Sequence, residues 1–481
     1  MKLKVVYNSQ KVRADAGVFL VYENDKSMVK IFDRYAISSD TLHKFGFSGK
    51  RDESIEFNPL ISKGIMGFIV LGIGDKHKFE LDNVRRAGGI LAGIIIKRKI
   101  KSVALLSIPD YKNYIRPFIE GIILGGYKFE RFKSEKTGDI VLKLIITEDA
   151  KKYRKEIEKA IVIAESTNFA RDLINTPGNY LTPVIFAKRT RVLAKKFGIR
   201  TRIYGPQDIT AMKMGALMGV AKGSTQPPRL ITWIYNGGKR NEKPIAFVGK
   251  GVTFDSGGIS IKPSENMGEM KNDMAGAAVV VSLMMVLGKL KPRLNAVGIV
   301  PAVENMPSGK ALKPGDIVTV SDGQTIEIIS TDAEGRLILA DGLSFAHKFK
   351  PKKIIDIATL TGAARVALGE TTAAIIGNND AMLKSIYEAG QRTSEKTWQL
   401  PLWDEYQELI KSEVADMKNS GGRSAGTITA SCLLSRFVKG VPWVHIDIAS
   451  VDNQAKSHPY LPKGATGFGT RLLAEYLLSL R

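Results

Sequence analysis

The stretch Ser330-Thr331-Asp332-Ala333-Glu334-Gly335-Arg336-Leu337 lies in the second half of a chain of 481 residues. It follows an apolar run at 326–329 that predicts a strand, and it precedes residues 337–346, whose apolar spacing predicts a helix. In extended backbone, residues i and i+2 point to the same side, so Asp332 and Glu334 can converge on one cation. Taken alone, the stretch is better explained as a helix start that Asp332 caps and at which Glu334 favours the positive end of the helix.

The composition is that of a globular protein large enough for two domains, with 44% hydrophobic and 25% charged residues. The apolar runs are too short to cross a bilayer, and the first residues lack a signal-peptide core. The single cysteine, Cys432, excludes an internal disulfide framework and a cysteine-rich zinc module. We therefore expect a soluble, cytoplasmic protein that does not associate with a membrane.

The formal net charge of +23 is unevenly distributed. Residues 151–200 hold 12 Lys and Arg against 4 Asp and Glu. Such a segment can bind nucleic acid, or it can be the solvated face of a helix in a lysine-rich protein. Because the sequence shows no zinc finger, RNA-binding signature or basic zipper, DNA remains an unproven alternative partner.

Short apolar runs alternate with helical patterns along the whole chain, which predicts an α/β fold. Residues 1–150 form a smaller N-terminal α/β domain, with strands expected at 18–21, 67–72, 102–106 and 140–145 and a helix at 82–99. A connector helix is expected at 151–174, and a cluster of turn residues at 175–183 opens the next domain. Residues 175–481 are expected to form a larger α/β domain, whose central mixed sheet is flanked by helices. Its strands are expected near 200–204, 230–235, 245–248, 354–358 and 443–448.

Four carboxylates and one amine stand on loops at predicted strand ends or helix starts of this second domain: Lys250, Asp255, Asp273, Asp332 and Glu334. In open α/β sheets, ligands bind outside the carboxyl ends of the strands. Clustered carboxylates repel one another unless positive charge lies between them, and two divalent cations supply that charge. Lysine can bind a metal only as the neutral amine, a form that adjacent cations favour. Such a donor set suits Zn²⁺, Mn²⁺, Mg²⁺ or Co²⁺.

At these positions the sequence resembles the leucyl aminopeptidase (cytosol aminopeptidase) family of two-metal exopeptidases. The segment 330–337 is similar to the family signature, in which asparagine commonly replaces Ser330. Further blocks match at 250–262, 271–278, 175–183, 359–362, 421–430 and 463–467, so the resemblance covers about residues 150 to 481. It implies that Asp255 and Glu334 bridge two divalent ions per subunit, Mn²⁺ or Zn²⁺, and that Lys250 and Asp273 complete one site while Asp332 completes the other.

The resemblance also assigns roles in the reaction. Lys262 would stabilise the oxyanion, and Arg336 would position a bicarbonate that acts as the general base. Asp273 and its metal would hold the free amino group of the peptide, which limits cleavage to the N-terminal residue. The pocket for an apolar, leucine-like or methionine-like first side chain would be lined by Met270, Thr359, Leu360 and Gly362, although core packing is an alternative for Met270. Relatives assemble as hexamers, so the resemblance also implies a homohexamer that acts on peptides.

A rival enzyme class is suggested by Gly422-Arg423-Ser424-Ala425-Gly426, which fits the nucleophile elbow of serine hydrolases. Asp447 and His458 follow it in the order that these enzymes use. However, the preceding residues 412–420 are polar and do not predict the strand that the elbow requires. We therefore interpret the glycines as shaping a loop.

Overall fold

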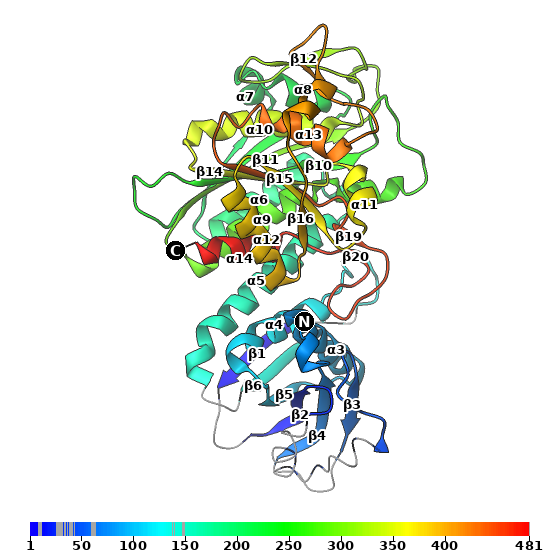
Figure 1. The fold of residues 1–481 in the computed structure, drawn as a ribbon, viewed down its shortest axis with the longest axis vertical. Helices are drawn as coiled ribbons and strands as arrows, with labels where there is room; N and C mark the ends of the chain where they lie inside the picture. The colour runs from blue at the N-terminus through cyan, green and yellow to red at the C-terminus, as the bar shows by residue number, and fades with distance from the viewer. Residues whose placement is uncertain are drawn as a thin grey trace. The chain divides into compact units, whose positions relative to one another are not determined.

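The computed structural model describes the chain apart from residues 8–11, 26–31, 33, 34, 36, 38–41, 43, 59–63, 137, 139, 147–149 and 481. The chain divides into two compact units (Figure 1). The first contains Met1–Glu165 and Gln454–Lys463, and the second contains Ser166–Asn453 and Gly464–Arg481.

The first unit is built on a six-stranded sheet in the order β1-β6-β5-β2-β4-β3. All neighbouring pairs are parallel except β3 with β4, which is antiparallel. Its strands are β1 Lys2–Tyr7, β2 Ala14–Val21, β3 Ser54–Phe57, β4 Ile65–Gly72, β5 Ser102–Ser107 and β6 Val141–Ile146. Its helices are η2 Lys76–Lys78, α3 Leu81–Arg98, α4 Tyr111–Gly125, η3 Ala150–Tyr153 and the first part of α5 Arg154–Ile174.

Two hydrophobic clusters form the core of this unit. One joins the sheet to α3 and α4, through residues such as Leu91 and Phe118. The other covers the remaining face with aromatic side chains, among them Phe19 and Phe68. Burial on both faces explains why the strands of a largely parallel sheet read as nearly continuous apolar runs in the sequence.

The second unit is built on a nine-stranded mixed sheet in the order β16-β15-β18-β14-β9-β11-β8-β7, with β10 paired to β11. The central strands β18, β14, β9 and β11 are parallel, whereas β15 and β8 pair antiparallel to their inner neighbours. The strands are β7 Arg200–Tyr204, β8 Arg229–Asn236, β9 Ile245–Gly249, β10 Gly251–Asp255, β11 Asn295–Asn305, β14 Lys353–Ala358, β15 Ala373–Gly377, β16 Thr397–Gln399 and β18 Trp443–Asp447. Small sheets are formed by β12 Ile317–Thr319, β13 Thr325–Glu327 and β17 Met417–Lys418, and by β19 Asn453–Gln454 and β20 Gly464–Ala465.

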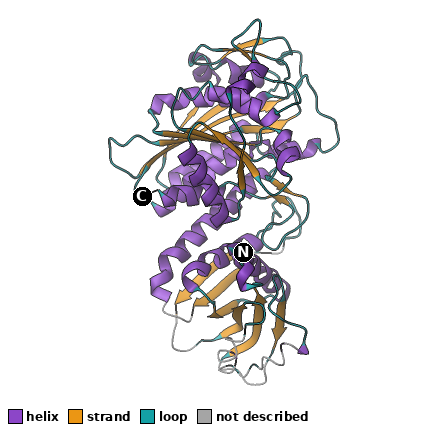
Figure 2. Ribbon diagram, viewed as in Figure 1, coloured by secondary structure: helices purple, strands orange, loops and turns teal. Residues whose placement is uncertain are grey.

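Helices cover both faces of this sheet (Figure 2). One face packs against α8, α10 and α13, and the other packs against α6, α9, α12 and α14 (Figure 1). The helices are η4 Gly178–Tyr180, α6 Pro183–Lys196, α7 Pro206–Ala211, α8 Gly215–Ala221, η5 Met267–Met274, α9 Ala275–Leu290, α10 Glu334–Ala346, η6 His347–Phe349, α11 Gly362–Leu368, α12 Asp380–Thr393, η7 Asp404–Ile410, α13 Gly426–Ser435 and α14 Thr470–Ser479. The predicted α/β class with a central mixed sheet is confirmed.

The helical stretch Met267–Leu290 has the length and apolar composition of a membrane span, but 89% of its most apolar window is buried inside the structure. Its helix α9 lies against the sheet, and a Cβ atom on Gly276 would come within 2.0 Å of the carbonyl oxygen of Ile357. Only glycine permits this approach, which explains why small residues stand at the start of α9. The stretch is therefore a core element of the second unit.

Candidate metal centre

All the side chains predicted to act in catalysis, metal binding and substrate binding line one cavity of about 500 Å³ in the second unit. These residues are Lys250, Asp255, Lys262, Met270, Asp273, Asp332, Glu334, Arg336, Thr359, Leu360 and Gly362. The cavity lies at the carboxyl ends of the central parallel strands, where open α/β sheets bind ligands.

The sheet positions these groups through interruptions at strand ends. Lys250 separates β9 from β10, and both of these strands pair with β11. Asp255 is the last residue of β10, Asp273 lies near the end of η5, and Glu334 is the first residue of α10. The Lys250 side chain lies so close to the first turn of α10 that a Cβ atom on Gly335 would come within 2.5 Å of its Cε.

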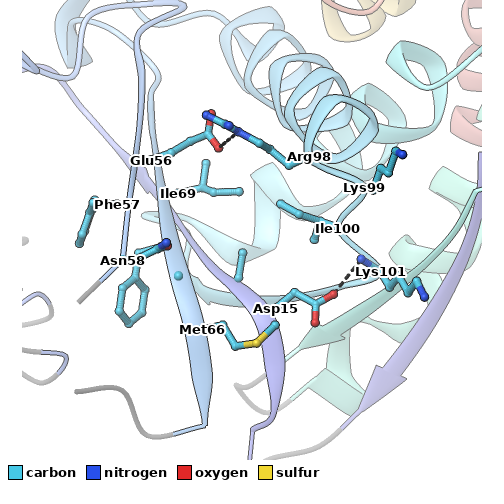
Figure 3. Close-up of a pocket in the computed structure, with 13 residues that line it drawn as sticks. Asp15, Glu56, Phe57, Asn58, Met66, Ile69, Arg98, Lys99, Ile100 and Lys101 are labelled. Carbon is cyan, nitrogen blue, oxygen red and sulfur yellow. Dashed lines mark hydrogen bonds and ion pairs between the residues drawn. The ribbon is translucent and has the colours of Figure 1, made fainter. Parts of the chain in front are cut away.

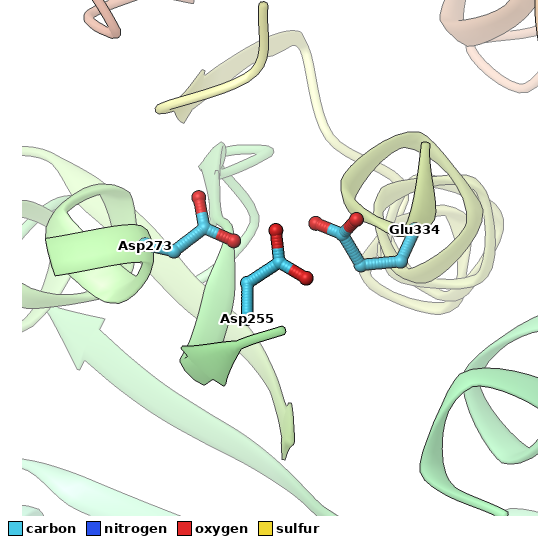
Figure 4. Close-up of side chains that lie close together, drawn as sticks. All are labelled: Asp255, Asp273 and Glu334. Atoms are coloured by element: carbon cyan, nitrogen blue, oxygen red, sulfur yellow. The ribbon is translucent and has the colours of Figure 1, made fainter. Parts of the chain in front are cut away.

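Three buried carboxylates face one point in the cavity (Figure 4). Asp255, Asp273 and Glu334 each offer an oxygen atom, and these oxygens lie within 4.8 Å of one another. In the described part of the chain, Asp273 Oδ2 and Glu334 Oε2 are buried and have no hydrogen-bond partner. An unsatisfied buried carboxylate oxygen is unfavourable, so this arrangement suits a cation.

Two lysines lie between the carboxylates. Lys250 Nζ is 2.7 Å from Asp273 Oδ1 and 2.9 Å from Glu334 Oε1. Lys262 Nζ is 2.9 Å from Asp255 Oδ2 and also pairs with Asp332. The ammonium groups thus supply positive charge between the acids.

The pKa values reflect this crowding. Burial raises the pKa of Asp273 and, together with Asp255, the pKa of Glu334. Burial also opposes the charge on Lys250, but Asp273, Glu334 and Asp255 outweigh it and raise the pKa of Lys250. Carboxylates whose ionised form is disfavoured by burial and by one another are stabilised as anions by an adjacent cation. The donor set therefore fits a divalent metal, with oxygen ligands and one amine.

The helix-cap interpretation of the opening stretch is wrong for Asp332, whereas Glu334 does lie in the first turn of α10, at the positive end of the helix. Ala333 occupies the N-cap position of α10, and the described residues provide no side-chain cap hydrogen bond there. The Asp332 carboxylate pairs with Lys262 instead, and Glu334 pairs with Lys250. The predicted strand at 326–329 is also shorter than expected, because β13 ends at Glu327 and the chain then turns toward the cavity.

Residues that the sequence did not single out hold the site in shape. Arg336 donates from Nη1 to the carbonyl of Asn419 at 2.7 Å, and burial lowers the pKa of Arg336 to about 10. The Asn419 side chain accepts from the backbone N–H of Ile329 at 2.7 Å and donates to the carbonyl of Ser330. Asn305 donates to Asp255 Oδ1 at 2.8 Å. An isolated asparagine gives no sequence signal for such a role.

The Thr359–Gly362 segment joins the lysine to the predicted substrate pocket. The Thr359 carbonyl accepts from Lys250 Nζ at 2.9 Å, and Thr359 Oγ1 donates to Asp273 Oδ1 at 2.8 Å. Asp447 accepts from the N–H of Leu360 at 3.0 Å and from Thr361 Oγ1 at 2.7 Å. Asp447 is thus a support for this segment.

The serine-hydrolase interpretation finds no support. Ser424 is exposed on a turn before α13, and the Asp447 carboxylate accepts hydrogen bonds from the Thr359–Gly362 segment. His458 belongs to the first unit, where it lies beside Arg86. No nucleophile–histidine–acid arrangement forms among the described residues.

The first unit contains a separate pocket, of about 780 Å³, that includes none of the predicted site residues (Figure 3). Three of its charged side chains have partners. Arg98 Nε pairs with Glu56 at 3.0 Å, and Asp15 accepts from the backbone N–H of Lys101 at 2.8 Å. The pocket therefore does not compete with the cavity of the second unit as the reactive centre.

Comparison with known proteins gives a consistent result. The family model described as "Cytosol aminopeptidase family, catalytic domain" matches residues 168–474, and the corresponding N-terminal domain model matches residues 24–136. A "Probable cytosol aminopeptidase" of Alkaliphilus oremlandii is 41% identical and covers 100% of both chains. One from Syntrophotalea carbinolica is 43% identical over 90% of this chain and 89% of that protein. The solved structure "Bottromycin maturation enzyme BotP in complex with Mn" aligns with a TM-score of 0.88 at 32% identity, over 97% of this chain and 99% of that one.

Proposed function

The chain belongs to the cytosol aminopeptidase family and is a peptidase, and on that premise we propose that it is a two-metal enzyme releasing apolar N-terminal residues from peptides. The observation that carries the proposal is the buried group of Asp255, Asp273 and Glu334, with two oxygens that have no partner in the described chain. Two of its oxygens stay unpaired even beside the lysines, and because burial disfavours carboxylate charge, a metal cation would stabilise the group.

The two ions would be held by the four acids that pair with the lysines and by the amine of Lys250. Asp255 and Glu334 would bridge them, Lys250 and Asp273 would complete one site, and Asp332 would complete the other. We propose Mn²⁺ or Zn²⁺, and the similarity to an enzyme solved with Mn supports manganese. When bound, the two ions would lower the pKa of a shared water to about 7 and so supply the hydroxide that attacks the peptide carbonyl.

The remaining residues act on the substrate. Lys262, released from Asp255 and Asp332 when metals take its place, would donate to the oxyanion, a contribution worth about 10²–10³ in rate. Arg336 faces the cavity as a guanidinium and would hold a bicarbonate that accepts the proton from the attacking water. Asp273 would bind the free amino group, while Met270, Thr359, Leu360 and Gly362 would contact the first side chain. A flexible Met wall suits leucine and methionine.

Hydrolysis of leucine p-nitroanilide tests the proposal. Protein treated with a chelator should be inactive, and Mn²⁺ or Zn²⁺ should restore turnover. Glu334→Ala should abolish the restored activity, while Asp404→Asn, an exposed acid elsewhere in the second unit, should leave it unchanged. Full activity without metal, or in Glu334→Ala, would contradict the two-metal site.

We also propose a cytoplasmic homohexamer acting on peptides, which light scattering of the purified protein would test. The alternative DNA-binding role gains no support from the comparisons. Its basic segment forms parts of α5 and α6, where Lys159 pairs with Glu156 of the same helix at 2.6 Å. We do not propose it.

A further inference from the structure

One wall of the active-site cavity carries an acid that the proposed reaction does not use. Asp452 lines the cavity and is only 8% exposed. Its backbone is fixed, because its N–H donates to the carbonyl of Ile448 at 2.9 Å and its carbonyl accepts from the N–H of Thr466 at 2.9 Å. A carboxylate on a rigid turn inside a binding cavity is well placed to determine specificity.

This acid belongs to the wall that would contact the first side chain of the peptide. Glu269 precedes Met270 in η5, and its Oε2 accepts from Asn453 Nδ2 at 3.1 Å. That hydrogen bond joins η5 to the segment that carries Asp452. Met270, Asp273 and Asp452 therefore lie on connected elements around one end of the cavity.

Two amide side chains add hydrogen-bond acceptors to this wall. Besides Asn453, Glu269 Oε2 faces Asn272 Nδ2 at 3.5 Å. Because a carboxylate only accepts hydrogen bonds, both amide nitrogens must face Glu269, and both amide oxygens must point elsewhere. Asn272, which is 6% exposed, and Asn453 both line the cavity, and neither Oδ1 has a donor within the described residues.

The charges around Asp452 leave it available for a ligand. Glu269 and Asp447 act on it as like charges, and Arg365 is the opposite charge that acts on it. In the described structure no ion pair joins Arg365 to Asp452, and Arg365 Nε instead lies 3.7 Å from Glu370. Burial raises the pKa of Asp452 to about 7, as expected of a carboxyl group that lacks a close cationic partner.

The same cavity offers apolar surface next to these acceptors. The half-buried Met270 lines it together with Leu360, Ala363 and Ala449. A side chain with an aliphatic stem and a cationic end can place its methylenes against such a surface and keep its charged end on a carboxylate. Lysine and arginine have this form.

We propose that the enzyme releases N-terminal lysine and arginine as well as apolar residues, with Asp452 accepting the cationic end of the side chain. This inference rests on the proposed aminopeptidase function. Asn272 and Asn453 supply further acceptors for the ammonium or guanidinium group, and Met270 contacts the stem. A residue with a short acidic side chain is a poor substrate, because Asp452 and Glu269 repel it.

The test compares lysine p-nitroanilide with norleucine p-nitroanilide, since norleucine keeps the aliphatic stem and lacks the ammonium group. The manganese-loaded wild-type enzyme should hydrolyse both. In Asp452→Asn, kcat/KM for the lysine substrate should fall about tenfold or more, because a charge-assisted hydrogen bond is lost, while the norleucine value stays within about threefold. Asp404→Asn, an exposed acid removed without touching the cavity, should change neither value.

The wild-type enzyme provides an independent test that does not depend on the variant folding. Ionisation of Asp452 should favour the lysine substrate, so the lysine-to-norleucine ratio of kcat/KM should rise between pH 6 and pH 8. A ratio that is independent of pH and below about one hundredth, or equal losses for both substrates in Asp452→Asn, would overturn the inference. Hydrolysis of leucine with no lysine activity refutes this inference alone, whereas no hydrolysis of any substrate refutes the proposed function.

Discussion

Replacing Gly335 by alanine tests whether the fold places Lys250 in the metal site. Gly335 lies in the first turn of α10, where the new Cβ would come within 2.5 Å of Lys250 Cε and 2.7 Å of Nζ. The lysine side chain is 4% exposed and pairs with Asp273 and Glu334, so it cannot withdraw to solvent. It has to shift within the cavity and lose at least one of these contacts.

The expected magnitudes separate stability from function. Alanine inside a helix is favoured over glycine by about 1 kcal/mol. Overpacking a buried site typically costs about 1–3 kcal/mol. The free energy of unfolding should therefore fall by no more than about 2 kcal/mol. A displaced ligand costs more in function, so metal affinity and kcat should each drop about 10- to 100-fold.

Three measurements decide the question: urea unfolding, calorimetric titration with Mn²⁺, and hydrolysis of leucine p-nitroanilide. Gly93→Ala in α3 is the matched control, because Gly93 also lies inside a helix but its Cβ would meet nothing within 4 Å. That variant should gain stability and keep full activity. Wild-type metal affinity and turnover in Gly335→Ala would refute the inference that this glycine makes room for the amine.

Other perturbations act on the supports of the site and on the core. Asp447→Asn should raise KM for peptide substrates about tenfold and lower stability by about 1–3 kcal/mol, because Thr361 and its segment lose a charged acceptor. Steady-state kinetics measure KM, and urea unfolding measures stability. An unchanged KM would contradict the supporting role of Asp447. His445 Nδ1 lies 2.5 Å from Asp356, and although burial disfavours its charge, Asp356 prevails and raises the pKa of His445. Its contribution to stability is therefore fully present below pH of about 6.5 and is lost as pH rises through the raised value, so the difference in unfolding free energy between wild type and His445→Gln should shrink above that pH. Burial raises the pKa of Cys432 to about 11, so iodoacetamide at pH 8 should label this thiol only after denaturation, and rapid labelling of the folded protein would show that the site is open.

The parts of the site that could be predicted from the sequence are those in which functional side chains lie in one short, recognisable segment. Two acids followed by a glycine and an arginine at 332–336 carry their own signal, as does Lys250 just after the apolar strand expected at 245–248. Each strand expected in the second domain is present, because the alternation and length of apolar runs depend on local burial. The register that unites these segments is long-range, and nothing local to Lys250 indicates that β9 and β10 both pair with β11.

The supporting residues could not be predicted for a related reason. Asn419, Asn305 and Asp447 act by accepting or donating across 50 or more positions in sequence, which only the folded chain defines. Asp452 could not be identified as a cavity residue from the sequence either. The strand expected at 443–448 ends before Asp452, and nothing local in the sequence indicates that this residue is buried in the cavity beside η5.

For the Asp332 carboxylate, the local rule for helix starts and the charges of the site predict different positions. Local rules favour a cap, since an acid one or two residues before a helix satisfies its free amides. A cap contributes about 1 kcal/mol to stability. Without Asp332, Lys262 would have only Asp255 as a carboxylate partner, in a region where burial already opposes the charge of the lysine. The competition is decided by Lys262, seventy residues away in sequence, which draws Asp332 out of the cap and toward the cavity. The positions of the side chains at this helix start are thus set by the electrostatics of the site, and α10 begins without a side-chain cap among the described residues.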